Sequence, residues 1–383
     1  MSKAQSAAVL IVSNGNATIK DHTAYTHHEN SAFLREAASL GLRIGYATIG
    51  LNAASEQIKN LSDDRLPDEV KLHLFAPLNR LSALGKLLAL PVSAVKILYL
   101  ISRYDLIYCY YPGKLSGLMV RMCRLLKKPY GLYVRGEVPA TPVNRRAVAH
   151  AKFILATGVC NVTRLVPDYP NCRETAPMCA VFNADLPAVP KTDFGQELHG
   201  IFVGRVERAK GVFELLDALA ELKRRGAAVR FTFVGAFGEE FAQAVEARRL
   251  TDRVVLTGLA KTPQELESYY RDADFFCLPT YTEGFPRVLY EAMAHGLPCI
   301  NTMVGGIPSR MRAGENCLAL KARDAGSIVD AISALAADPE LARRLSRASL
   351  ETFACWKRRF AGSSHAIQLK ESVDSTLKEQ KCH

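Results

Sequence analysis

The 383-residue sequence lacks a long apolar run of the kind expected in a signal peptide or a membrane-spanning helix. The first apolar run, residues 7–12, ends at Ser-Asn-Gly and is too short for the core of a signal peptide, so we expect a β-strand. The segment 81–101 is the one candidate for a membrane span. It contains Lys86, Pro91 and Lys96, whereas a spanning helix needs about 20 mostly apolar residues. We therefore predict one or two amphipathic helices there.

Several functional motifs are also absent. The ten cysteines have no C-x-x-C spacing, and Cys172 and Cys179, with six residues between them, are poorly set for zinc. Reduced, buried thiols in a cytosolic protein are the expectation, with no bound metal and no cofactor. No G-x-x-x-x-G-K-[ST] string is present, and no G-x-G-x-x-G follows a strand, which argues against a P-loop NTPase and a dinucleotide enzyme.

Acidic residues are scarce in one region. Residues 79–166 hold 14 Lys or Arg but only Asp105 and Glu137 as acids, a charge of +12 within a chain whose total is +11. A concentrated basic surface indicates an anionic partner such as lipid headgroups, phosphates or nucleic acid. No recognisable motif for reading RNA or DNA accompanies it, so we expect no nucleic-acid partner.

The chain is long enough for two domains, and its pattern predicts an α/β fold with two doubly wound parallel sheets. In the second half we expect strands at 200–206, 229–235, 253–258, 274–280 and 298–303, and helices at 212–226, 239–250, 263–273 and 284–296, with two more within 326–355. In the first half we expect strands at 8–12, 43–48, 105–110, 130–134 and 152–156, and a helix at 29–40. The proline-rich stretch 184–195 is the predicted linker.

Ligands of open parallel sheets bind beyond the carboxyl ends of the strands, so the segments that follow the strands are examined first. GRVERAKG, residues 204–211, follows one strand and offers Gly204 for close backbone approach, with Arg205 and Lys210 as cations. Together with the start of the next helix they form a candidate diphosphate cradle. The alternative is a basic loop whose side chains all face water.

A second segment, YTEGFPR at 281–287, follows the fourth strand of that half and leads into the apolar helix that contains Glu291. A buried carboxylate needs a partner. Glu291 is suitably placed to accept hydrogen bonds from the two hydroxyls of a ribose. The alternative is that backbone amides or Arg287 satisfy it. Taken together, the two segments predict a site for a nucleoside diphosphate with a further group attached.

These strings resemble a known family. E-G-F-P-R-V-L-Y-E, with seven residues between Glu283 and Glu291, is similar to the signature of the retaining glycosyltransferases of family 4, in which G-R-x-x-x-x-K-G lies some 75 residues earlier. The string GGIP, residues 305–308, resembles that family's glycine-rich loop, and VFNAD, residues 181–185, is similar to a degenerate N-G-x-D. Where the family often has Glu, this chain has Ser309. The resemblance covers most of residues 195–350.

The resemblance implies a GT-B architecture: two facing Rossmann-like domains whose last helices cross back to the first. The expected divisions are an acceptor domain at 1–190, a donor domain at 195–355 and a returning helix or tail at 356–383. The resemblance implies catalytic roles for Glu283, Arg205 and Lys210. It implies a metal-independent donor site formed by Gly204, Arg205, Lys210, Glu283, Gly284, Phe285, Pro286, Arg287 and Glu291, and we add Gly15, whose backbone is expected to approach the donor phosphates.

Candidates for contacts with the acceptor lie in the first half. Arg135 and Glu137 follow a predicted strand, although they are equally consistent with a simple ion pair, and His27 and His28 are equally consistent with surface loop positions. The basic region and the apolar segment 81–101 together predict an anionic membrane surface as a partner. A buried crossover with solvated lysines is the alternative.

The resulting hypothesis is an enzyme: a retaining hexosyltransferase that moves a sugar from a nucleoside diphosphate sugar to a glycan or polyprenyl-linked acceptor. Bacterial surface polysaccharide or lipopolysaccharide synthesis is the expected setting, with the protein cytoplasmic and peripheral on the inner face of the plasma membrane. Two alternatives stay open: an assembly factor that binds nucleotide sugars without turnover, and a nucleotide-sugar epimerase.

Overall fold

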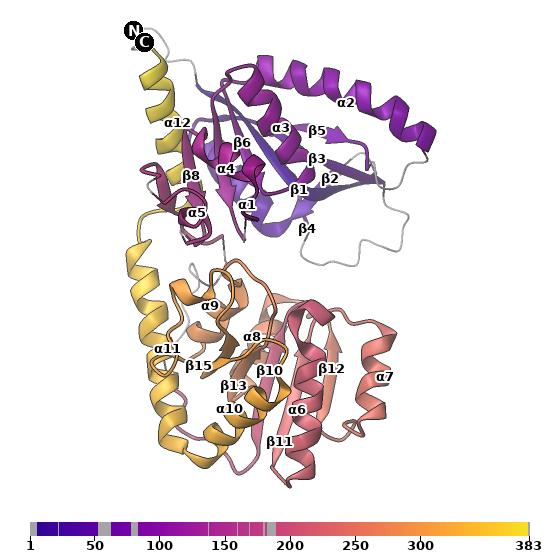
Figure 1. The fold of residues 1–383 in the computed structure, drawn as a ribbon, viewed down its shortest axis with the longest axis vertical. Helices are drawn as coiled ribbons and strands as arrows, with labels where there is room; N and C mark the ends of the chain where they lie inside the picture. Colours follow the sequence, from indigo (N-terminus) through magenta and orange to yellow (C-terminus); the bar gives the residue numbers. More distant parts are fainter. Residues whose placement is uncertain are drawn as a thin grey trace. The chain divides into compact units, whose positions relative to one another are not determined.

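A computed structural model describes residues 6–21, 23–52, 63–77, 83–136, 138–158, 160–167, 169–178, 181 and 189–381. The chain forms two compact units, shown in Figure 1. Unit 1 comprises Met1–Met178 and Gly362–His383, and unit 2 comprises Cys179–Ala361. Within the described residues, no helix is both long enough and apolar enough to cross a membrane.

Unit 2 is a six-stranded parallel sheet with helices packed around it (Figure 1). Its strands are β10 (Leu198–Val203), β11 (Val229–Val234), β12 (Val254–Gly258), β13 (Phe275–Leu278), β14 (Cys299–Thr302) and β15 (Cys317–Leu320). Its helices are α6 (Val212–Arg224), α7 (Glu239–Ala247), α8 (Pro263–Asp272), α9 (Arg287–Ala294), α10 (Ala325–Ala337) and α11 (Pro339–Arg359), with short 3₁₀ turns η3 (Arg208–Lys210) and η4 (Ile307–Ser309). The predicted strands and helices of this half are confirmed apart from their ends.

Local sequence explains why these elements begin where they do. β10 is buried along its whole length, as a central strand of a parallel sheet covered on both faces must be. Helix α8 begins at a Thr262 side chain that accepts a hydrogen bond from the Glu265 amide, with Pro263 at the first helical position. Asp338 caps α11 in the same way, before Pro339.

Unit 1 is built around one nine-stranded sheet. Its strands are β1 (Ala8–Lys20), β2 (Thr23–His27), β3 (Arg43–Asn52), β4 (Asp63–Arg65), β5 (Lys71–Phe75), β6 (Leu106–Tyr111), β7 (Tyr130–Val134), β8 (Phe153–Ala156) and β9 (Cys172–Glu174). Its helices are α1 (His28–Ser39), α2 (Ala83–Arg103), α3 (Lys114–Leu125), α4 (Pro142–Ala149), α5 (Cys160–Thr163) and α12 (His365–Lys381). The parallel strands follow the order β5-β3-β1-β6-β7-β8-β9, and β2 and β4 add antiparallel pairs.

Two local predictions in this half are wrong. The first strand does not end at Val12, because β1 continues to Lys20 with a register shift between Val12 and Asn16, so Gly15 lies within an irregular strand and not in a turn. At this irregularity the Gly15 carbonyl accepts a hydrogen bond from Thr48 Oγ1 at 2.7 Å, and its amide donates to Ser13 Oγ at 3.1 Å. The predicted loop that carries His27 and His28 is instead the end of β2 and the start of α1.

Other predictions in unit 1 are confirmed. The segment 81–101 contributes a single helix, α2, with Pro91 inside it. The C-terminal segment returns to unit 1, where α12 packs against α1 and β8. In both units most of the described thiols are free and buried, at Cys109, Cys123, Cys277, Cys299 and Cys317, whereas Cys172 is half-buried and Cys355 is exposed.

Candidate functional site

The strand order of unit 2 locates the first candidate site. With β10 taken as the first strand, the order β12-β11-β10-β13-β14-β15 corresponds to 3-2-1-4-5-6, the Rossmann arrangement. The order reverses between β10 and β13, which pair in parallel. The crevice outside the carboxyl ends of these two strands is where such sheets bind ligands. GRVERAKG follows β10 and YTEGFPR follows β13, so both segments lie at this point.

The side chains of Lys210 and Glu283 meet there. Lys210 ends η3, and its ammonium donates a hydrogen bond to Glu283 Oε1 in an ion pair. Each side chain is only 19% exposed, so this cation does not simply face water. Arg205 differs: it is 75% exposed and pairs with Glu207 at 3.3 Å. The structure therefore brings one of the two predicted cations to the Glu283 turn.

Close backbone contacts join the loops around this pair. The Tyr281 amide donates to the Ala209 carbonyl at 3.0 Å, which ties the segment after β13 to η3. Gly211 has φ +70°, and a Cβ there would lie 2.0 Å from the Pro279 carbonyl oxygen. Only glycine fits such a position.

The GGIP loop packs against the same turn. The Gly306 amide donates to the Gly284 carbonyl at 2.8 Å. Gly305 has φ +57°, and a Cβ there would lie 1.8 Å from the Glu283 carbonyl oxygen. Ser309, at the position where Glu was expected, donates its hydroxyl to the Gly306 carbonyl at 2.5 Å. Three loops that follow β10, β13 and β14 therefore form one continuous backbone surface.

Glu291 has partners within the protein. Tyr270, a buried residue of α8, donates its hydroxyl to Glu291 Oε2 at 2.8 Å. Burial lowers the pKa of Arg287, and the negative charge of Glu291, one turn later on α9, opposes that shift. The sequence alternative in which Arg287 helps to satisfy Glu291 is therefore supported. Sequence reasoning missed Tyr270, because only the packing of α8 against α9 brings it near.

The remaining residues of the EGFPR string have structural roles. Phe285 is 6% exposed and packs on Tyr290 with ring centroids 4.7 Å apart. Pro286 immediately precedes α9, as expected of a proline near the first helical position. Sequence reasoning also missed Arg310, a buried cation that lies 4.6 Å from the Phe285 ring and 4.2 Å from the Trp356 ring. It holds the EGFP turn against α11.

Unit 1 reverses its strand order between β1 and β6, and Asn14 lies at that point. Its side-chain amide donates to the Tyr110 carbonyl and, at 3.0 Å, to Ser116 Oγ. A Cβ on Gly113 would lie 1.9 Å from the Asn14 side chain, so glycine is needed at the start of α3. Asn14 was not among the predicted residues, although it is the direct neighbour of Gly15.

The predicted acceptor-side residues are dispersed over unit 1. His28 Nδ1 lies 2.6 Å from Asp64 of β4, and His27 Nδ1 lies 3.8 Å from Glu29. Arg135 follows β7 and is exposed, and its carbonyl accepts a hydrogen bond from Thr157 Oγ1 at 2.9 Å. Glu137 and most of the VFNAD string, residues 182–185, lie outside the described residues.

Comparison with solved structures identifies the class of fold. A sucrose-phosphate synthase from Thermosynechococcus elongatus superimposes with a TM-score of 0.70 at 19% identity, over 97% of this chain and 100% of that one. Alr3699/HepE of Anabaena, solved with UDP-glucose, gives 0.65 at 16% identity, over 97% and 99%. Two Rossmann-like α/β domains with such neighbours define the GT-B fold of glycosyltransferases.

Sequence comparison is more specific for unit 2. Residues 198–338 match the family model described as glycosyl transferases group 1. A D-inositol 3-phosphate glycosyltransferase of Corynebacterium jeikeium is 34% identical over 148 residues, which is 37% of this chain and 35% of that protein. A Salmonella typhimurium protein named as a colanic acid biosynthesis glycosyltransferase, WcaL, is 32% identical over 142 residues, or 35% of each chain. The matched region thus spans about a third of these curated relatives.

Proposed function

We propose that the protein is a retaining glycosyltransferase of family 4 that uses a nucleoside diphosphate sugar as donor. The observation that carries this proposal is the Lys210–Glu283 pair at the point where the strand order of unit 2 reverses. An ammonium has three donors, and one of them is accepted by Glu283, so Lys210 retains the capacity to bind diphosphate oxygens. Solved complexes of Alr3699/HepE with UDP and UDP-glucose support a nucleotide-sugar donor.

In the proposed reaction the bond between the anomeric carbon and the donor phosphate breaks as the acceptor hydroxyl oxygen bonds to that carbon. Negative charge grows on the leaving diphosphate in the transition state. Lys210 and Arg205, whose side chain is long and exposed, stabilise this charge more in the transition state than in the bound substrate. The acceptor attacks from the face of the leaving group, so the anomeric configuration is retained. The departing phosphate takes the acceptor proton, and no side chain acts as a dedicated base.

The remaining site residues keep their proposed roles. Glu283 lies beside the donor sugar, Glu291 accepts hydrogen bonds from the ribose, and the backbone of 284–287 binds sugar hydroxyls and phosphate. No metal is needed in this scheme, because the cations and the start of α9 neutralise the leaving group. His27, His28, Arg135 and Glu137 remain candidates for the acceptor side, and Gly15 for the donor phosphates.

The proposed acceptor is a glycan or a lipid-linked sugar, in bacterial surface polysaccharide or lipopolysaccharide synthesis. The name of the colanic acid relative supports a polysaccharide pathway. An apolar surface on α2 and α3 supports a cytoplasmic protein bound to the inner face of the membrane: Val92 and Val95 of α2 and Leu125 of α3 are 68%, 67% and 74% exposed, and α3 also carries basic side chains.

Release of nucleoside diphosphate from a panel of UDP-, GDP- and ADP-sugars tests the proposal. One donor should be turned over in the presence of lipid-extract acceptors, equally well with and without EDTA. Lys210→Gln should lower kcat about 100-fold, because it removes charge stabilisation of the leaving group. Lys223→Gln, which removes another ion-paired lysine of the same unit, should leave kcat unchanged. Binding of a donor without any release would instead favour the assembly factor.

A further inference from the structure

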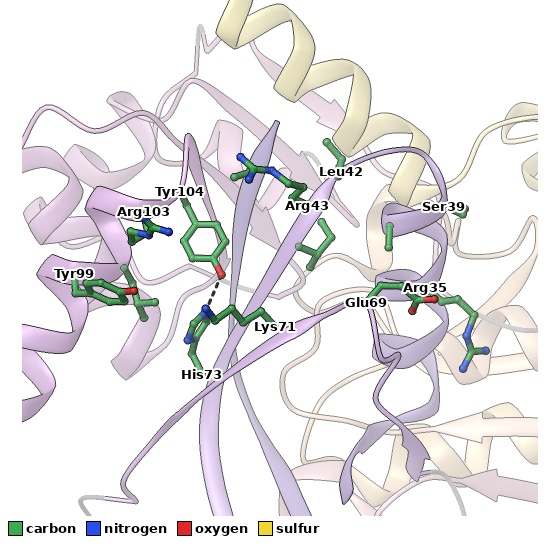
Figure 2. A pocket seen from close by; sticks show the side chains of 14 residues that line it. Arg35, Ser39, Leu42, Arg43, Glu69, Lys71, His73, Tyr99, Arg103 and Tyr104 are labelled. Carbon is green, nitrogen blue, oxygen red and sulfur yellow. Dashed lines mark hydrogen bonds between the residues drawn. The ribbon is translucent and has the colours of Figure 1, made fainter. Parts of the chain in front are cut away.

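A cavity of about 570 Å³ lies in unit 1, shown in Figure 2. Its lining includes Ala8, Arg43 and Lys71, which are the first residues of the parallel strands β1, β3 and β5. It is therefore at the amino ends of these strands, the edge opposite to that at which open parallel sheets bind their usual ligands. Its size is in the range of small-molecule sites.

The lining of this cavity is strongly basic. Four cations, Arg35, Arg43, Lys71 and Arg103, are accompanied by one carboxylate, Glu69. In the described parts of the chain none of the four forms an ion pair. Arg43 donates its Nε to the Ser6 carbonyl at 3.1 Å, and its two terminal nitrogens have no described acceptor. Asp105, the acid next to Tyr104 in the chain, is not in the lining and accepts the Ala8 amide at 2.7 Å.

Helix ends account for only part of this charge. Helices α1 and α2 end at the cavity, where Ser39 and Arg103 line it, and each helix C-terminus carries about half a negative charge. The four cations, Glu69 and the two helix ends together leave an excess of roughly two positive charges. A phosphate monoester carries about −1.5 to −2 at pH 7. The charge of the cavity therefore matches that of one such group.

The floor of the cavity is a buried polar pair. His73 Nε2 and the Tyr104 hydroxyl lie 2.7 Å apart (Figure 2). Burial, reinforced by Lys71 and Lys96, lowers the pKa of His73 to about 4, so the ring is neutral at pH 7. Burial and the neighbouring Tyr99 raise the pKa of Tyr104, and the positive charges of Arg103 and Arg43 oppose that shift. A Cβ on Gly45 would lie 2.1 Å from that hydroxyl, so this glycine makes room for the ring.

Apolar surface completes the walls, chiefly the ring of Tyr99, which is 53% exposed, with small exposed parts of Leu42 and Ile44. We propose that this cavity binds a phosphate monoester that bears an apolar group. The planar guanidinium groups of Arg43 and Arg103 each donate several hydrogen bonds to the phosphate, and the apolar walls contact the attached group. This site is additional to the donor site of unit 2. The phosphate has two possible sources, a soluble phosphorylated metabolite or the headgroup of phosphatidic acid.

Calorimetric titration of the 383-residue chain with phenyl phosphate tests the site. The donor site also attracts phosphate, so the titration is repeated with Lys210→Gln, which should retain the binding. The double variant Arg43→Gln/Arg103→Gln should bind at least about tenfold more weakly, because each lost charge-assisted hydrogen bond contributes to affinity. Arg145→Gln/Arg146→Gln removes the same charge from exposed positions of unit 1 and should bind like the unaltered protein.

Equal weakening in the two double variants would overturn the proposal, since binding would then reflect only the general charge of unit 1. So would loss of binding in Lys210→Gln alone. Circular dichroism and the melting temperature without ligand report whether each variant is folded. Tyr104→Phe adds an independent test, because it keeps the ring but removes the hydroxyl on the floor, and a local site should respond by a measurable loss of affinity.

Vesicles of phosphatidylcholine with and without phosphatidic acid distinguish the two sources. If the headgroup is the ligand, phosphatidic acid vesicles should compete with phenyl phosphate, and Arg43→Gln/Arg103→Gln should lose more vesicle binding than Arg145→Gln/Arg146→Gln. If a soluble metabolite is the ligand, the two double variants should bind vesicles equally while differing toward phenyl phosphate.

Discussion

At the scale of single residues, Glu291 shows how a carboxylate is accommodated on an otherwise apolar helix. Tyr270 donates a hydrogen bond to it from α8, and Arg287 lies one turn earlier on α9. The Tyr270 hydrogen bond fixes the direction of the carboxylate before any ligand binds. This is the arrangement expected of a group that must recognise hydroxyls at a defined position.

The Tyr270 hydroxyl is therefore expected to matter for stability and for donor affinity. Tyr270→Phe should lower the free energy of unfolding by about 1.5–3 kcal/mol, the usual effect of removing a hydrogen bond to a charged group. It should also raise KM for the donor more than it changes kcat. Urea unfolding and steady-state kinetics measure the two effects.

Tyr269→Phe is the matched control on the same helix. Tyr269 donates to Glu265 Oε1 at 3.0 Å, but both lie near solvent, so the loss should stay below about 1 kcal/mol with no effect on KM. Similar losses of stability in both variants would show that Glu291 does not depend on Tyr270.

The sequence was enough to predict the site residues whose role follows from their spacing along the chain. It did not predict residues whose partners come from distant segments of the chain. Lys210 and Glu283 were predicted to converge because each follows a strand of one parallel sheet, and they do. Arg205 follows the same strand but pairs with Glu207, because a long exposed side chain can turn to a nearer acid. Arg310 could not be anticipated, since its aromatic neighbours come from α9, α11 and the loop between β13 and α9.

At the scale of elements, the strands of unit 2 were predictable because a buried parallel strand is a continuous apolar run. β1 was predicted too short, because Ser-Asn-Gly-Asn resembles a turn and only pairing with β3 on the far side of the register shift reveals the strand. β15 was missed: its sequence Cys-Leu-Ala-Leu contains none of the β-branched or aromatic residues that favour a strand.

Helix α12 begins at a buried histidine that holds it to unit 1. His365 lies 2.8 Å from both the Tyr108 hydroxyl and Thr175 Oγ1, and its ring packs edge-on against Tyr133 at 4.3 Å. Burial, with a smaller effect of the Arg135 charge, lowers its pKa to about 3. The folded protein therefore favours the neutral form of the His365 ring.

Stability should fall as the pH drops from 6.5 toward 3. In this range the unfolded chain is protonated at His365, whereas the folded chain is not. At pH 5 the free energy of unfolding should be lower by about 2 kcal/mol from this residue. Urea unfolding at pH 7.5, 6 and 5 measures the slope. His365→Gln should make the slope shallower, while the part due to the buried His73 remains, and His150→Gln, which alters an exposed histidine, should leave the slope unchanged. An unchanged slope in His365→Gln would contradict the assignment.

At the scale of the whole molecule, unit 1 carries +10 of the net charge of +11, and its helix α2 also exposes apolar side chains. Val92 and Val95 lie on one face of α2. This combination supports attachment to an anionic membrane surface, since apolar burial and attraction to charged lipids act together.

Val92→Ser/Val95→Ser should weaken binding to phosphatidylglycerol vesicles at least about tenfold, because two apolar side chains no longer enter the interface. Val189→Ser/Val255→Ser provides the control: these valines are 68% and 54% exposed but lie in unit 2. Sedimentation with vesicles at low and high salt measures both effects, and salt should weaken the unaltered protein. Identical sedimentation of the two double variants would exclude α2 as the attachment site.

The return of α12 to unit 1 also determines which stretches of the chain must be expressed together to obtain each unit separately. Ala366, Leu369 and Val373 are fully buried among residues of unit 1, so a polypeptide cut after residue 178 would leave part of its interior open to water. A version of that half with a closed interior has to contain both residues 1–178 and residues 362–383. The other half, by contrast, is encoded without interruption and can be expressed as a single stretch.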